Sequence, residues 1–130
     1  MMVLQRFDDR LRPWFFVGWC LVWVAVILAI LDPSPVSIRL VSDKVIHFTS
    51  FLAISLASVT FCRTALQLGF ATAFCLAAAI LLEMTHYVLP SRSFELADMV
   101  ANLAGTAAGT LTALLLLRML QRHWSPEAAR

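Results

Sequence analysis

Four long apolar runs dominate the chain and predict four transmembrane helices. The runs cover about residues 14–31, 45–62, 65–82 and 97–117. Each run approaches the roughly 20 residues that an α-helix needs to cross a hydrocarbon core of about 30 Å. The runs are continuous and do not alternate with polar residues, which favours helices over the strands of a membrane barrel. We therefore expect an all-α integral membrane bundle that forms a single domain over residues 1–130.

The composition indicates that lipid surrounds much of the chain. Hydrophobic residues make up 61% of the 130 residues and charged residues 14%, whereas a soluble domain is about half apolar and about a quarter charged. So short a chain cannot hide that much apolar surface in one soluble core. The formal net charge of +2 is small, and we expect membrane lipids and no nucleic acid as partners.

The distribution of basic residues predicts the orientation of the helices. The two tails and the short loop at Arg63 together carry seven Lys and Arg residues, and the other two loops carry three. Because cytoplasmic loops are enriched in Lys and Arg, we expect both termini in the cytoplasm of a multi-pass protein of the cell (inner) membrane. The loops at about residues 32–44 and 83–96 would then face outward.

The few titratable side chains near the apolar runs fall into two groups. The first group opens the second run and comprises Asp43, Lys44 and His47. The second group ends the third run, fills the next loop and opens the fourth run; it comprises Glu83, His86, Arg92, Glu95 and Asp98. In the expected topology both groups lie at the outer face. Charged side chains in membrane segments are costly and usually functional, so these residues are the main candidates for a site.

Local spacing suggests what some of these residues do. Asp43 and His47 are four positions apart and share a helix face, so the carboxylate could orient the ring for acid–base chemistry. Asp43 would equally suit a helix N-terminus on electrostatic grounds alone. Glu83 and His86 are three positions apart, as in the metal-binding pairs of carboxylate-bridged bundles. A capping ion pair that holds the loop is the other interpretation of Glu83.

The fourth run opens with a polar face and continues with small residues. Asp98 and Asn102 are four positions apart, so both would point into the bundle. Gly105 and Gly109 have the spacing that permits close contact between two helices. In the preceding loop Arg92 offers a planar fork for phosphate or carboxylate, although it would also suit a solvated loop. We expect the charged candidates to converge in one outward-facing pocket.

Taken in order, these motifs resemble those of the VanZ-like family of small integral membrane proteins. The motifs are Asp43-Lys44-x-x-His47, Glu83-x-x-His86, Pro90-Ser91-Arg92-Ser93 and Asp98-x-x-x-Asn102-x-x-Gly105-x-x-x-Gly109. The resemblance covers about half of the chain. Two positions depart from the family pattern, which usually has Gln in place of His86 and Gly in place of Ser91.

The resemblance implies a role in the cell envelope. The founding member of the VanZ-like family is associated with resistance to the glycopeptide teicoplanin, and relatives occur beside genes for envelope and exopolysaccharide metabolism. The family has also been proposed to belong to a wider group of membrane enzymes that act on lipid head groups.

Our leading hypothesis is an enzyme, a hydrolase or a transferase, that acts on the phosphate-containing head group of a membrane or polyprenyl lipid. His47 would be its base or nucleophile, and a divalent metal is compatible with the carboxylates. The catalytic candidates are Asp43, His47, Glu83, His86 and Asp98, and the substrate-binding candidates are Lys44, Arg92 and Asn102.

Two other functions compete with this hypothesis. One is a non-catalytic accessory protein that binds lipid or antibiotic, either as a homo-oligomer or with envelope-biosynthesis partners. The other is a transporter or channel, which is disfavoured because such proteins carry polar groups near the middle of the bilayer.

Overall fold

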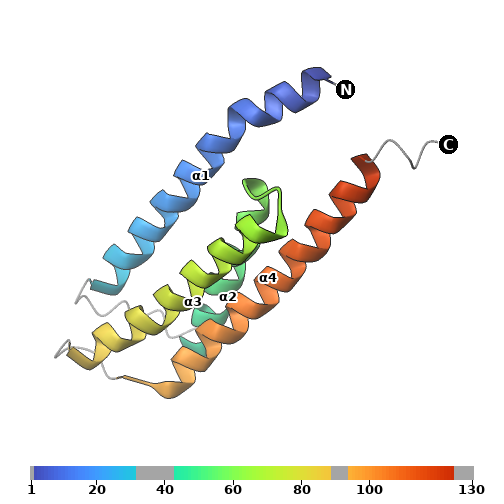
Figure 1. Cartoon of the computed structure of the whole chain (residues 1–130). Helices are drawn as coiled ribbons and strands as arrows, with labels where there is room; N and C mark the ends of the chain where they lie inside the picture. Colours follow the sequence, from blue (N-terminus) through green and yellow to red (C-terminus); the bar gives the residue numbers. More distant parts are fainter. Residues whose placement is uncertain (1, 32–42, 89–93, 125–130) are drawn as a thin grey trace.

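The computed structural model describes residues 2–31, 43–88 and 94–124, and these residues are helical apart from short connections (Figure 1). Four α-helices follow one another along the chain: α1 (Met2–Leu31), α2 (Asp43–Ala57), α3 (Ala65–Val88) and α4 (Leu96–Trp124). A short 3-10 helix, η1 (Ser58–Thr60), extends α2. No strand occurs in this part of the chain, so the predicted all-α class is confirmed.

Three helical segments, not four, are long and apolar enough to cross a membrane among the described residues. They are Asp9–Leu28, Ala65–Thr85 and Leu96–Gln121. The prediction of a spanning helix over 45–62 is wrong, because α2 has only 15 residues. At 1.5 Å per residue it measures about 22 Å, which is less than the thickness of a bilayer core.

Two hydroxyl side chains form hydrogen bonds where α2 ends, before the apolar run does. Ser58 Oγ donates a hydrogen bond to the Ser55 carbonyl oxygen at 2.6 Å, and Thr60 Oγ1 donates one to the Ala57 carbonyl oxygen at 2.7 Å. Such bonds compete with the regular helical ladder, and here the chain tightens into η1. An apolar run therefore continues through a place where the α-helix stops.

Successive helices run in opposite directions, so the chain crosses the bundle four times although α2 is short (Figure 1). The start of α1 and the end of α4 lie at the same end of the bundle. The starts of α2 and α4 lie at the other end, together with the end of α3. This arrangement brings the described members of both titratable groups to one end.

Helices α2 and α4 form the closest pair in the fold, because two glycines let their backbones meet. A Cβ atom on Gly105 would collide with the carbonyl oxygen of Phe48, and one on Gly109 would collide with the carbonyl oxygen of Leu52. The small-residue contact expected from the sequence is therefore present, and its partner is α2.

The bundle has an apolar core around Trp19, Trp23 and Phe51, yet it also buries several polar side chains, and apolar side chains cover much of its surface. The buried polar residues include Ser55, Glu83, Asp98, Asn102 and Thr106. Large apolar side chains are exposed along α1, α3 and α4. An apolar surface of this extent is unusual for a soluble domain and suits a bundle whose outer surface faces lipid tails.

Candidate functional site

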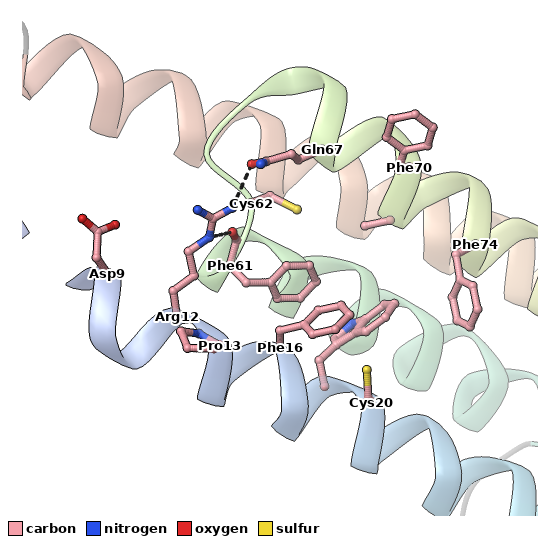
Figure 2. A pocket seen from close by; sticks show the side chains of 12 residues that line it. Asp9, Arg12, Pro13, Phe16, Cys20, Phe61, Cys62, Gln67, Phe70 and Phe74 are labelled. Atoms are coloured by element: carbon pink, nitrogen blue, oxygen red, sulfur yellow. Dashed lines mark hydrogen bonds between the residues drawn. The ribbon is translucent and has the colours of Figure 1, made fainter. Parts of the chain in front are cut away.

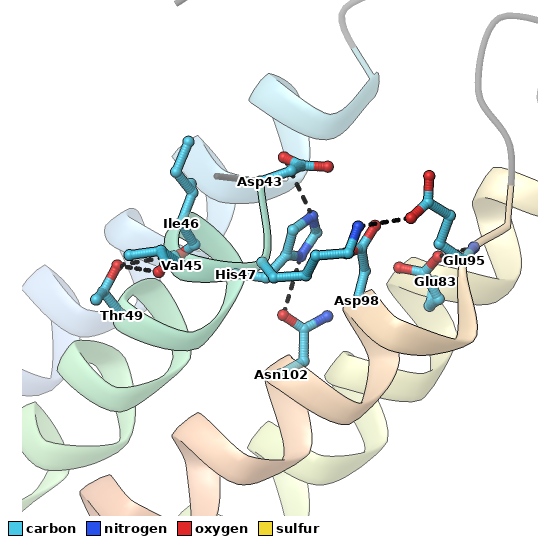
Figure 3. Close-up of polar contacts among 10 residues, drawn as sticks. Asp43, Val45, Ile46, His47, Thr49, Glu83, Glu95, Asp98 and Asn102 are labelled. Atoms are coloured by element: carbon cyan, nitrogen blue, oxygen red, sulfur yellow. Dashed lines mark hydrogen bonds and ion pairs between the residues drawn. The ribbon is translucent and has the colours of Figure 1, made fainter. Parts of the chain in front are cut away.

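Seven polar residues gather where α2 and α4 begin and α3 ends (Figure 3). We call them the polar cluster. They are Asp43, Lys44 and His47 from α2, Glu83 from α3, Glu95 from the residues just before α4, and Asp98 and Asn102 from α4. Because α2 and α4 run in the same direction and touch through the glycines, the first turns of both helices face each other.

Asn102 holds the imidazole of His47 in place. His47 Nδ1 lies 3.0 Å from Asn102 Oδ1. An amide oxygen can only accept a hydrogen bond, so Nδ1 carries the proton and donates it. The neutral ring then keeps its lone pair on Nε2. Asn102 is only 1% exposed, so this orientation is set from inside the bundle.

Asp43 lies beside the opposite ring nitrogen of His47. Its Oδ1 is 3.8 Å from His47 Nε2, which is an ion-pair distance but too long for a hydrogen bond. The spacing of Asp43 and His47 suggested that Asp43 orients the ring. In the structure Asn102 orients it instead. The Asp43 side chain is 63% exposed and forms the open side of the polar cluster.

Lys44 bridges two carboxylates on the far side of His47. Its Nζ lies 2.6 Å from Glu95 Oε2 and 3.2 Å from Asp98 Oδ1. The hydrogen bond to Glu95 is the main cause that raises the pKa of Lys44, and the same bond lowers the pKa of Glu95. The ammonium expected to bind substrate phosphate is thus already engaged within the protein.

Glu83 fastens the segment that leads into α4. Its carboxylate is buried, and Oε1 accepts a hydrogen bond of 3.0 Å from the backbone N–H of Glu95. The interpretation of Glu83 as a residue that holds the loop therefore has a direct contact behind it. Through this bond α3 helps to position Glu95, which in turn contacts Lys44.

Asp43, His47 and Asp98 form the most compact group of metal-ligand side chains in the polar cluster. One ligand atom from each lies within 4.8 Å of the other two. Asp98 and His47 are largely buried, with side chains 6% and 15% exposed. These three residues come from two helices, and their proximity depends on how α2 packs against α4.

Two predicted site residues fall outside what the structure describes. Arg92 belongs to residues 89–93, and although the backbone of His86 lies in α3, its side chain is not among the described ones. Glu95 belongs to the second titratable group of the sequence, but its spacing predicted no role for it. The structure places Glu95 in contact with Lys44 and Glu83.

A second group of polar contacts marks the opposite end of the bundle. Arg63 Nη2 pairs with Asp9 Oδ1 at 2.7 Å, and Arg12 donates hydrogen bonds to the Phe61 carbonyl oxygen and to Gln67 Oε1. Gln121 donates a hydrogen bond of 2.8 Å to the Arg63 carbonyl oxygen. These contacts join the start of α1, the start of α3 and the end of α4.

An apolar pocket of about 710 Å³ opens beside these contacts, between α1 and α3 (Figure 2). Phe16, Phe61, Phe70 and Phe74 contribute to its wall, and Arg12 lies at its polar edge. We call it the aromatic pocket. No local pattern in the sequence predicts this pocket, because its aromatic residues come from separate parts of the chain.

Comparisons with known proteins place the chain in a family. A search of curated proteins finds no match, and a search of solved structures finds none either. The family model described as VanZ/LLP1 matches residues 7–118, which include most of α1 and α4, all of α2 and α3, and the whole polar cluster. The resemblance seen in the motifs is thereby confirmed, and the chain belongs to the VanZ/LLP1 family.

Proposed function

We propose that this protein is a cell-envelope membrane enzyme that acts on the phosphate-containing head group of a membrane or polyprenyl lipid. The observation that carries the proposal is the geometry around His47. A buried amide holds Nδ1–H, which leaves Nε2 as a base beside the carboxylates of Asp43 and Asp98. A histidine oriented in this way can take a proton from water or from an acceptor alcohol.

The depth of the polar cluster supports a substrate at the membrane interface. About 34 Å of helix α4 separates Asp98 from Gln121 at 1.5 Å per residue, close to the thickness of a bilayer core of about 30 Å. Polar contacts at these two levels would thus lie near the two interfaces. A lipid head group reaches this depth, whereas its tails would lie along the apolar surface of the bundle.

Each residue of the polar cluster has a role in this proposal. His47 is the general base or nucleophile, and Asp98 and Asp43 stabilise positive charge near the ring. Asn102 positions the ring, and Glu83 holds the segment before α4. Lys44 and Arg92 bind the phosphate, and Lys44 can do so by exchanging one of its two carboxylate partners.

We propose the inner membrane as the location, with the polar cluster facing outward and both termini in the cytoplasm. The basic residues of the tails and of the Arg63 loop support this orientation. In the cell the reaction would serve envelope polysaccharide metabolism or teicoplanin resistance, as expected from the VanZ-like resemblance.

Head-group release from defined lipids tests the proposed activity. The purified protein is incubated in detergent micelles with phospholipids and polyprenyl phosphates, and the products are measured by mass spectrometry. We expect His47→Ala and Asp98→Asn each to lower the release of head group by about a hundredfold or more, because general acid–base groups contribute about 10²–10⁴-fold. Thr49→Ala is the control, since this exposed hydroxyl bonds only to carbonyls of its own helix.

Undiminished release by both variants would contradict the proposed activity. So would the absence of any product from the unmodified protein across the lipid set. Variants are compared only where size-exclusion chromatography shows the same monodisperse species as the unmodified protein.

A non-catalytic role in binding lipid or antibiotic is the second candidate, and the aromatic pocket favours it. Its apolar walls fit a hydrocarbon chain, and Arg12 could meet an anionic group at its edge. In that case no product appears, and the amount of lipid that copurifies falls in Phe16→Ala but not in Asp98→Asn. If the protein is an enzyme, turnover falls in Asp98→Asn but not in Phe16→Ala.

A further inference from the structure

We infer that Asp43, His47 and Asp98 bind one divalent transition-metal ion of the Zn²⁺ or Mn²⁺ class. As a cofactor of the lipid reaction, this ion rests on the proposed function. With the ion bound, His47 Nε2 would be a ligand without a free lone pair, so the ion would supply the activation of water that the metal-free proposal gives to His47. As a binding site, it is defined by its own geometry and can be measured without any lipid substrate.

The three ligand atoms are close enough to surround one ion after a small movement. They lie within 4.8 Å of one another, whereas ligands about 2.0–2.2 Å from one tetrahedral ion are about 3.3–3.6 Å apart. Closing a gap of up to about 1.5 Å falls on the side of the cluster that can adjust, because Asp43 is exposed at the start of α2. His47 and Asp98 are held inside the bundle.

The hydrogen bond from His47 to Asn102 is the second observation that points to an ion. A metal-binding histidine usually donates its other ring N–H to a carboxylate or carbonyl oxygen, which fixes the tautomer and aims the lone pair at the metal. Here Asn102 Oδ1 accepts that N–H from Nδ1. Nε2 is left facing Asp43, which supplies the carboxylate on that side.

Asp98 offers an oxygen that the protein leaves under-used. Its side chain is 6% exposed, and Oδ1 accepts no hydrogen bond from the described residues. Its one close cation there is Lys44 Nζ, an ion-pair contact at 3.2 Å. Burying a carboxylate oxygen costs free energy unless a positive charge or a hydrogen bond compensates it. An ion between Asp98 and His47 would add positive charge beside this oxygen.

The charge of the polar cluster also calls for a cation when a phosphate binds. Its members carry four carboxyl groups, those of Asp43, Glu83, Glu95 and Asp98, against one ammonium. A phosphate head group brings further negative charge to the same place. A divalent ion would reduce this repulsion and could polarise a phosphoryl oxygen.

The type of ligand selects the class of metal. One imidazole nitrogen and two carboxylate oxygens suit Zn²⁺ and Mn²⁺, whereas Mg²⁺ and Ca²⁺ prefer oxygen ligands alone. Three protein ligands also leave a position for water or for a substrate oxygen, as in catalytic zinc sites.

Replacing Lys44 by a neutral residue should increase the affinity of the protein for the metal ion. Its ammonium lies against Asp98 and would have to move away from that carboxylate when the ion binds. Removing the positive charge should therefore tighten metal binding, whereas removing a ligand should weaken it. A purely structural ion-pair cluster would respond to neither change with altered metal affinity.

The test is a calorimetric titration of chelator-stripped protein in detergent with Zn²⁺ and, separately, with Mn²⁺. We expect one ion per chain for at least one of the two metals. His47→Gln and Asp98→Asn should each lower the affinity by about tenfold or more, and Asn102→Ala by about tenfold. Lys44→Gln should raise the affinity, and Asp9→Asn, at the far end of the bundle, should leave it unchanged.

Two outcomes would overturn the metal site: no stoichiometric binding by the unmodified protein, or the same affinity in His47→Gln, Lys44→Gln and the unmodified chain. The lipid assay separates this failure from failure of the proposed function. Stoichiometric metal binding without head-group release contradicts the enzyme alone, and head-group release by fully stripped protein contradicts the metal site alone.

Discussion

His47 lies between a buried amide and an exposed carboxylate, and this gives its two ring nitrogens different environments. Asn102 accepts the proton of Nδ1 from within the bundle, and Asp43 approaches Nε2 from the open side. The neutral amide orients the ring without adding a negative charge to a cluster that already holds four carboxyl groups. A further negative charge would repel an anionic substrate.

Lys44 and Glu95 form an exposed pair, and it should make stability depend on pH at both extremes. The folded state lowers the pKa of Glu95 from its ordinary value of 4.5, so this contribution is present above pH 4.5 and is lost as the pH falls through the lowered value. It raises the pKa of Lys44 from 10.5, so that contribution is lost as the pH rises through the raised value. Thermal unfolding in detergent should show a small decrease in Tm below pH 4.5.

Glu95→Gln serves as the control for this dependence. Its Tm should be slightly lower than that of the unmodified protein at pH 7, and the difference should shrink as the pH falls below 4.5. Added salt should reduce the difference as well, because both side chains are about half exposed. A difference that stays constant with pH would show that the pair contributes nothing through its charge.

The contact between α2 and α4 decides whether the site exists at all. Most residues of the polar cluster belong to these two helices, and Gly105 and Gly109 let their backbones approach. Larger side chains would push α2 outward and separate His47 from Asn102. A helix contact one or two turns away thus controls a hydrogen bond in the site.

Gly105→Ala should therefore lower both stability and activity. The added methyl group meets the backbone of Phe48, and overpacking of this kind costs about 1–3 kcal/mol. We expect a lower Tm in detergent together with weaker metal binding and slower head-group release. Gly69→Ala is a matched control, since nothing lies within 4 Å of its added Cβ.

Gly69→Ala should be neutral or stabilising, because alanine is the better helix former by about 1 kcal/mol. Equal effects of Gly105→Ala and Gly69→Ala on Tm and turnover would show that close contact of α2 with α4 is not needed.

The described part of the molecule has two polar ends separated by an apolar layer, and the start of α1 and the end of α4 lie at the same end (Figure 1). The polar cluster occupies one end, and the contacts of Asp9, Arg12 and Arg63 occupy the other. The orientation predicted from basic residues assigns the second end to the cytoplasm. It also assigns the loop between α1 and α2 to the outside.

Cysteine labelling in intact cells tests this orientation. In a chain whose Cys20, Cys62 and Cys75 have been replaced by alanine, we expect Ser37→Cys to react with a membrane-impermeant maleimide. Ala128→Cys should react only after the cells are permeabilised. The reverse pattern would place the polar cluster on the cytoplasmic side and would exclude an outer-leaflet head group as substrate.

Hydropathy, charge and motif order determined much of this protein without coordinates. The apolar runs predicted helices and a lipid environment, because a helix in lipid must satisfy its own backbone and cover itself with apolar side chains. The spacing of Asp43 with His47, of Asp98 with Asn102, and of Gly105 with Gly109 predicted residues that share a helix face. Those relations are local, so the sequence contains them.

Tertiary structure alone decided which faces meet. It ended α2 at Ala57 although the apolar run continued, so only three described helices are long enough to span a membrane, while the short α2, which lies between α1 and α3 in the chain, still passes through the bundle. It paired His47 with Asn102, brought Glu95 to Lys44 and Glu83, and opened the aromatic pocket at the far end. These contacts join residues far apart in the chain, and they depend on how closely two helices can pack, which no local pattern records.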